Sequence, residues 1–424
     1  MSDPRPVLAE YFVTERATVL QLIRADLAEP AVETIPLGRD ELHRLVRDAF
    51  ASDGPTSRFR ALDPSAWVEP LSMLIEPVTR YCEPGDVVWL VPHDMLHYVP
   101  MHALDTGEGP LIERNPVCYS PSASVMRYCQ AKVYQDRRPV LVYADTRADA
   151  PLVHARGQAD VLTRLFDDRI TTRIGPAATI SALARDVADH SDGIGVLHLS
   201  CHGFFTGDDP LQSGLLMAPE PSDDGRLTVE RIMSLRLPAE LITLSACESG
   251  VSDRHAGDEL IGLTRALIYA GAAGVVVSLW AVDDLSTSMF MGYLYSALSS
   301  GVPRAQALRT AQVRLRGTSR ADVVEHCRQA LAATGNDHMG QQRALLRGLA
   351  DTHYAAGDFA TALEVYERID AGLGDEPPEP WLLTALARTR VALRHLDPGP
   401  VDYGHQAYAH PYYWAPFILV GDWR

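Results

Sequence analysis

The sequence has little cysteine and no cysteine pair of the Cys-x-x-Cys type. Its 424 residues contain only 6 scattered cysteines. That number is too small for a disulfide framework in a chain of this length. We therefore expect a cytosolic protein whose thiols stay reduced.

Positive charge is also scarce, and long apolar runs are missing. The chain carries 38 Lys and Arg against 55 Asp and Glu, a formal net charge of −17. Binding of nucleic acid or of an anionic membrane surface requires clustered basic residues, so neither partner is expected. The longest apolar run, residues 271–282, has 12 residues and is too short to span a bilayer. The start, MSDPRPVLAEYF, lacks the order of basic and apolar residues that a secretory signal has.

What remains is the composition of a soluble globular protein, with 46% hydrophobic and 22% charged residues. Residues 1–80 show helical apolar spacing at 41–50 and 67–81, and we expect this region to be helical. Further along, short apolar runs alternate with helical patterns, which is typical of a parallel α/β sheet covered on both faces. The predicted strands are residues 87–91, 115–120, 140–144, 195–200, 241–245 and 275–280. After residue 316 only helices are predicted, until strand character returns at 415–420.

Ligands and catalytic groups on parallel sheets lie beyond the carboxyl ends of the strands. Two such positions carry reactive side chains. His202 and Gly203 follow the strand 195–200, and Cys247 follows the strand 241–245. A cysteine nucleophile needs a base and a pair of donors for the tetrahedral oxyanion, and neighbouring strand ends would supply both. The histidine precedes the cysteine by 247 − 202 = 45 residues, which is the chain order of caspase-type enzymes and the reverse of papain-type enzymes.

Each motif also has a simpler interpretation. A cysteine at a strand end is often a small buried hydrophobic residue, and His-Gly after a strand is often a turn. Cys201 should pack on the opposite face from His202, and His198 is expected to be a core histidine. His93, His97 and His102 do not have the spacing of a helical metal site, so no metal or other cofactor is predicted.

Several separated motifs resemble the CHAT domain, a bacterial caspase/separase-like peptidase family often joined to TPR repeats. The resemblance covers roughly residues 80–316 and 405–424. The motifs are, in order, VVWLVPHDMLHYVPMHAL, VLHLSCHGFF, SGLLMA, TVERIMSLRL, LITLSACESG, GDELIGLTRALIYAGAAGVVVSLWAVDD and HPYYWAPFILVGDWR. It implies a caspase-like, mostly parallel sheet flanked by helices.

The resemblance also implies the roles of site residues. It places the family's histidine at His202, its cysteine at Cys247 and an oxyanion-hole position at Gly203, with the backbone N–H of Cys247 as second donor. Ser249 stands where many relatives have threonine, and no third residue that would orient His202 is evident. The caspase signature QAC[RQG]G is missing, so a preference for aspartate is not implied.

Four acidic residues near the strand ends are candidates for a substrate pocket that receives a basic side chain. They are Asp145, Glu248, Asp283 and Asp284. The alternative, which we favour for the three aspartates, is that they cap the helices that follow.

Residues 346–369 fit a TPR unit, with Ala350, Ala362 and Tyr366 at the positions where two helices pack. Fewer than two full repeats cannot bury their own faces, so we expect this segment to dock on the rest of the chain or on a partner.

The predicted organisation has five parts: a helical region at 1–80, a degenerate half of the CHAT domain at 81–138, a catalytic core at 139–316, a helical TPR-like insertion at 317–404 and a closing strand at 405–424. We expect a cytoplasmic cysteine endopeptidase that acts on a protein or peptide substrate and is regulated by a protein partner or a signal. The alternative is a non-catalytic interaction scaffold.

Overall fold

The computed structural model describes most of the chain. The described residues are 5–50, 64–132, 138–147, 149, 152–190, 192–204, 206, 209–245, 256–280, 283–335, 338–374, 376–396 and 399–424. Within them, one sheet of eleven strands has the order β3-β2-β1-β4-β5-β14-β13-β12-β8-β6-β7. Its strands are β1 Pro6–Val13, β2 Thr18–Ile23, β3 Ala31–Ile35, β4 Val87–Val91, β5 Val117–Tyr119, β6 Val140–Ala144, β7 Ile170–Ile174, β8 Ile194–Ser200, β12 Ala239–Leu244, β13 Gly274–Ser278 and β14 Phe417–Gly421.

The sheet is mostly parallel, as predicted. Neighbouring strands are antiparallel only in the pairs β1–β2, β2–β3 and β13–β14 of the described sheet. All residues of β4, β6 and β14 are buried, because their continuous apolar sequences pack against helices on both faces. The covering helices are α1 Arg39–Phe50, α3 Ser65–Leu71, α4 Glu76–Tyr81, α5 Leu111–Arg114, α6 Ala123–Gln130, α7 Val153–Phe166, α8 Ile180–Asp189, α9 Val229–Ser234, α10 Ala256–Ala270, α11 Asp284–Ser299, α12 Arg304–Arg316 and α17 Pro411–Trp414. None of the described helices combines the length and apolar character that a membrane crossing requires.

The expectation that residues 1–80 are helical is wrong for their first part. Residues 6–35 form the strands β1, β2 and β3, and only the later part is helical. The residues of β3 (AVETI) alternate between half-buried and exposed positions, which is the two-residue period of a strand. β1 pairs in parallel with β4, whose sequence lies about 80 residues further along, and local periodicity does not predict such a partner.

The last strand lies in the middle of the sheet. β14 pairs with β13 on one side, in antiparallel fashion, and with β5 on the other. It therefore joins the strands formed by residues 6–119 to those formed by residues 140–278. A single core of buried apolar residues runs through both halves.

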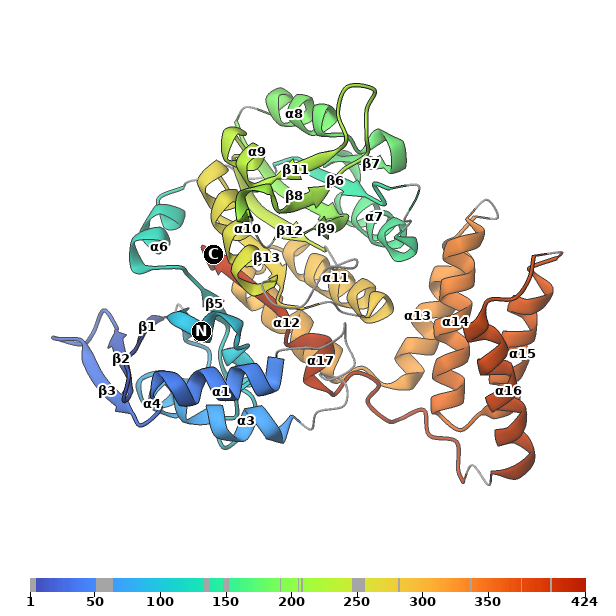
Figure 1. Cartoon of the computed structure of the whole chain (residues 1–424), viewed down its shortest axis with the longest axis horizontal. Helices are drawn as coiled ribbons and strands as arrows, with labels where there is room; N and C mark the ends of the chain where they lie inside the picture. Colours follow the sequence, from blue (N-terminus) through green and yellow to red (C-terminus); the bar gives the residue numbers. More distant parts are fainter. Residues whose placement is uncertain are drawn as a thin grey trace.

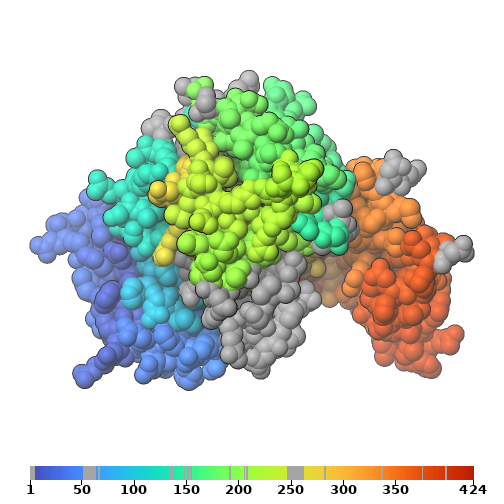
Figure 2. All heavy atoms as spheres, turned by 45° about the horizontal axis from the view of Figure 1, so that its top comes forward, coloured from blue at the N-terminus to red at the C-terminus, as the bar shows by residue number. Residues whose placement is uncertain are grey.

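Four helices lie beside this α/β body, and we refer to them as the helical unit. They are α13 Arg320–Ala333, α14 Met339–Ala355, α15 Phe359–Ala371 and α16 Pro380–His395. The helical unit and the N-terminal strands lie at opposite ends of the molecule (Figures 1 and 2). Ala350, Ala362 and Tyr366 are fully buried in a small core of this unit, at the packing positions predicted for a TPR pair.

The helical unit docks on the α/β body, as one of our two expectations required. Leu345 and Leu349 of α14 belong to the main core, whereas Leu346 and Ala350 belong to the unit's own core. The two faces of α14 thus connect the two cores.

Candidate active site at the ends of two parallel strands

The two strands that precede the predicted dyad are direct neighbours. β8 and β12 run parallel, with Leu199 opposite Leu244. The Ser245 N–H donates to the Leu199 carbonyl over 2.9 Å. The prediction that these strands end side by side is therefore confirmed. Cys247 and Glu248 lie outside the described residues.

His202 begins a second, smaller sheet directly after β8. This sheet has the order β11-β10-β9, with β9 at His202–Phe204, β10 at Gly214–Leu216 and β11 at Arg226–Thr228. Antiparallel pairing sets His202 opposite Leu216 and Gly203 opposite Leu215. The His202 side chain is largely buried, at 8% exposure, so the small sheet fixes its position at the sheet edge.

A carboxylate outside the predicted site residues lies near His202. Asp149 is held by two hydrogen bonds of 2.9 Å from the Arg147 guanidinium. These bonds, with a smaller contribution from His202, lower the pKa of Asp149 to about 2. Asp149 is therefore ionised at neutral pH and within electrostatic reach of His202. Asp149 lies outside the motifs that suggested His202 and Cys247, so the sequence did not indicate it.

The five described cysteines have the character of core residues. Cys82, Cys118, Cys129, Cys201 and Cys327 are all free and buried. Burial raises the pKa of every one of these thiols, for Cys201 to about 12. A thiol with such a pKa is a poor nucleophile at neutral pH. The packing role predicted for Cys201 is confirmed.

His198 is a core histidine, as predicted. It is fully buried and makes contacts of 2.8 Å with the Tyr295 hydroxyl and 3.2 Å with Gln158 Oε1. Burial lowers its pKa to about 3, so the ring is neutral at physiological pH. It lies four residues before His202 on the same chain and has no catalytic character.

Two of the candidate pocket carboxylates are used by helix starts. The Asp283 carboxylate caps α11 and accepts a hydrogen bond of 2.9 Å from the Ser286 N–H. The Asp145 carboxylate accepts from the Leu152 N–H and, at 2.7 Å, from the Arg156 side chain. Asp284 is an exposed residue of the first turn of α11. For Asp283 this is the capping role that we favoured.

The three histidines that follow β4 serve different contacts. His93 Nδ1 accepts from the Val13 N–H over 3.2 Å, and His97 lines a small cavity with residues of β13 and β14. His102 bonds to the Tyr119 hydroxyl (2.9 Å) and to Gln312 (2.9 Å), and burial lowers its pKa to about 3. Among the described residues, no group of three or more potential ligands is arranged to hold a metal ion.

Comparisons with known proteins match most of the chain to one family and parts of it to individual proteins. The family model of the CHAT domain matches residues 71–422. Tetratricopeptide repeat protein 28 of Homo sapiens is 36% identical over 91 residues, which are 22% of this chain and 4% of that protein. The Mus musculus protein of the same name is 36% identical over 85 residues, 20% of this chain and 3% of its own length. The chain thus spans only a few per cent of the length of these curated relatives.

Two solved structures are similar at 10% sequence identity. The Arg-specific cysteine proteinase gingipain R aligns with a TM-score of 0.38 over 60% of this chain and 63% of its own. The separase of the Saccharomyces cerevisiae separase–securin complex aligns with a TM-score of 0.47 over 73% of this chain and 29% of its own. The family model covers far more than half of the 424 residues, and the chain therefore belongs to the CHAT domain family.

Proposed function

We propose that the protein is a cysteine endopeptidase that cleaves protein substrates with His202 and Cys247. The observation that carries the proposal is the parallel pairing of β8 with β12, whose carboxyl ends lie side by side directly before these two residues. The described cysteines support it by elimination, because all five are buried thiols with raised pKa values. Membership of the CHAT domain family supports it further.

In the proposed reaction, His202 takes the proton of the Cys247 thiol, and the thiolate sulfur forms a bond to the scissile carbonyl carbon. The oxyanion accepts hydrogen bonds from the backbone N–H groups of Gly203 and Cys247, each worth roughly 3 kcal/mol in comparable sites. His202 then gives its proton to the leaving amine as the C–N bond breaks. Water hydrolyses the thioester and restores the thiol.

We also propose that the helical unit regulates this site as the docking place of a protein partner. Its α14 approaches the first turn of α11, since a Cβ on Gly348 would lie 2.6 Å from Leu285 Cδ2. α11 follows β13, the parallel neighbour of β12, so its first turn lies at the sheet edge of the proposed dyad. A partner that binds the helical unit could therefore affect the site through the contact between α14 and the first turn of α11. The reduced thiols suit the cytoplasm of a bacterium.

A scaffold without catalysis is the second candidate. The observation that favours it is the outer face of α16, where Leu383 (53%) and Val391 (57%) are exposed, eight residues apart. On a helix, residues at this spacing lie on one face, which suits a partner.

Labelling by an electrophilic peptide probe separates the two candidates. We expect the native protein to be labelled once and Cys247→Ala to lose that label, while the matched variant Cys201→Ala keeps it. His202→Ala should slow labelling. Equal labelling of the native protein and Cys247→Ala, or no labelling of either, would favour the scaffold.

A further inference from the structure

The small sheet places a cation on the same face as His202. Leu216 lies opposite His202 on one side and opposite Arg226 on the other. Residues paired across neighbouring strands point to the same face of a sheet, so His202, Leu216 and Arg226 form one row. Phe204, two residues after His202, lies on this face as well.

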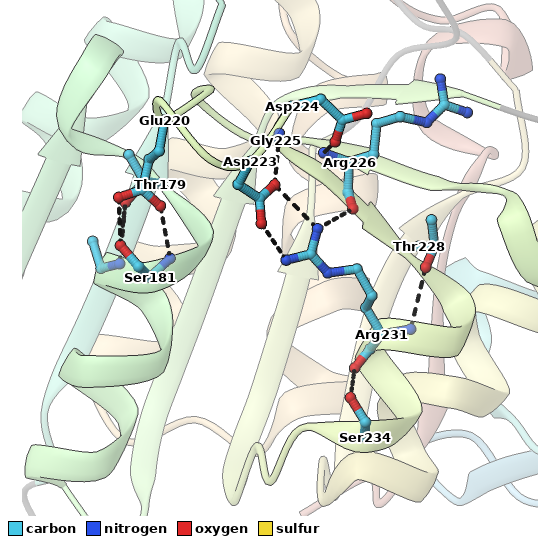
Figure 3. A network of polar contacts seen from close by, with 11 residues as sticks. Thr179, Ser181, Glu220, Asp223, Asp224, Gly225, Arg226, Thr228, Arg231 and Ser234 are labelled. Atoms are coloured by element: carbon cyan, nitrogen blue, oxygen red, sulfur yellow. Dashed lines mark hydrogen bonds and ion pairs between the residues drawn. The ribbon is translucent and has the colours of Figure 1, made fainter.

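The Arg226 side chain is exposed and rests on an aromatic ring. Its guanidinium carbon lies 3.9 Å from the ring centroid of Phe204, a cation–π contact that limits its rotamers. In Figure 3 the guanidinium points away from the neighbouring Asp223–Arg231 pair. Among the described residues, no carboxylate forms an ion pair with it.

The other cations of this region are already neutralised. Arg147 pairs with Asp149 at 2.9 Å, and Arg231 pairs with Asp223 at 2.5 Å. Unlike Arg147 and Arg231, the Arg226 guanidinium forms no ion pair with a carboxylate of the described residues and can bind an anionic ligand.

The backbone of Arg226 is held rigidly by the network of Figure 3. Its carbonyl accepts from Arg231 Nη1 over 3.0 Å, and its N–H donates to Asp224 Oδ1 over 3.0 Å. The preceding Gly225 has φ +80°, and a Cβ there would lie 2.3 Å from the Met217 carbonyl, so only glycine fits this turn. The Gly225 N–H donates to Asp223 over 2.9 Å. A ligand that binds Arg226 meets a side chain whose attachment point is already ordered.

We infer that Arg226 determines substrate specificity by binding the carboxylate of an aspartate or glutamate close to the scissile bond. The inference rests on the proposed peptidase function. Arg226 and His202 are two strands apart, about 10 Å between backbones at about 4.8 Å per strand spacing. An extended peptide advances about 3.3 Å per residue, so the acidic side chain lies within about three residues of the bond that is cleaved. This acidic preference is the opposite of the pocket for basic side chains that was considered from the sequence, which stays a prediction.

The test compares pairs of quenched fluorescent peptides that differ only in one acidic residue and its amide, Asp against Asn or Glu against Gln. The parent peptide is chosen from an unbiased library cleaved by the native protein. We expect the native protein to prefer the acid by about 10-fold or more in kcat/KM, the range of a charge-assisted hydrogen bond. Arg226→Gln should reduce this preference to within about twofold, and Arg226→Lys should restore part of it.

Arg236→Gln is the matched control, because Arg236 is an exposed arginine that precedes β12, at the opposite end of that strand from the site. It removes the same charge and should keep the full acid preference. Equal rates on acid and amide, or a preference that survives Arg226→Gln, would overturn the inference while cleavage itself persists. If no peptide is cleaved in a manner that depends on Cys247, both the proposed function and this inference are wrong.

Discussion

At the scale of single residues, complete burial explains the inert character of His198 and Cys201. His198 and His202 are four residues apart, and the first is enclosed between Tyr295 and Gln158. Its neutral form is fixed by burial, which lowers its pKa to about 3. The same physical effect raises the pKa of Cys201 to about 12. The surroundings of a histidine or cysteine therefore determine its protonation state more than its residue type does.

The buried histidines predict a specific loss of stability in acid. The pKa of His198 and of His102 is lowered to about 3, against about 6.5 in an unfolded chain. As the pH falls below about 6.5, the unfolded state takes up these protons first, so stability is complete above that pH and decreases below it. Each histidine lowers the free energy of unfolding by up to about 1.4 kcal/mol per pH unit until the pH reaches about 3.

Denaturant titrations between pH 7 and 4.5, about the range above carboxylate protonation, measure this slope. In His198→Gln, the free energy of unfolding should fall less steeply with decreasing pH, by the contribution of one buried histidine. His405→Gln, at an exposed position, should keep the slope of the native protein. An unchanged slope in His198→Gln would contradict the assignment of a buried neutral histidine.

At the scale of elements, local sequence patterns predicted most of the core and missed the parts that depend on distant partners. The strands β4 and β6 were predicted with the bounds that the structure has, because each is a continuous apolar run of five residues. β9, β10 and β11 were not predicted. They have three residues each, which is too short for a periodicity to be visible. The cation on β11 was missed for the same reason.

The candidate site shows the same division. The sequence was sufficient to expect His202 at the end of β8, next to the end of β12. Asp149 and Arg226 lie near His202 only because of the tertiary fold. Neither residue belongs to a motif that could be recognised in the sequence.

The contact between α14 and α11 predicts a stability change at Gly348. A Cβ at this position would lie 2.6 Å from Leu285 Cδ2, so a larger side chain must displace the buried Leu285 side chain or the helices themselves. We expect Gly348→Val to lower the free energy of unfolding by about 1–3 kcal/mol, the range of overpacking. Gly292→Val on α11 is the control, because nothing lies within 4 Å of a Cβ there. Thermal unfolding compares both variants, and equal melting temperatures would contradict the close helix approach.

At the scale of the whole molecule, the helical unit is inserted between α12 and the strand that completes the sheet. The two ends of the insertion lie side by side: the Ala407 N–H donates to the Thr318 carbonyl over 2.8 Å, and the Ala321 N–H to the Tyr403 carbonyl over 3.0 Å. The return segment continues into α17, whose Tyr412 carbonyl accepts from Trp280 Nε1 over 3.1 Å, directly after β13. The insertion therefore contacts the region of the proposed site twice, through α14 against α11 and through the return segment that leads into α17.

This geometry allows the insertion to be removed. Replacing residues 318–402 by a short flexible linker joins two neighbouring points of the chain, so the α/β body should fold with β14 in place. We expect its cleavage rate to differ several-fold from that of the full chain, because the first turn of α11 loses its packing against α14. Circular dichroism establishes that the shortened chain is folded. A folded protein with an unchanged rate would contradict regulation by the helical unit.

In the proposed mechanism, His202 and Cys247 together cleave peptide bonds. The most direct measurement is the cleavage profile of an unbiased peptide library by the native protein, beside Cys247→Ala and His202→Ala. We expect specific cleavage by the native protein and a fall of about 1,000-fold or more in kcat/KM for each variant, since both groups act in the same bond-breaking step. Cleavage that persists unchanged in Cys247→Ala, or a native protein that cleaves no peptide, would contradict it.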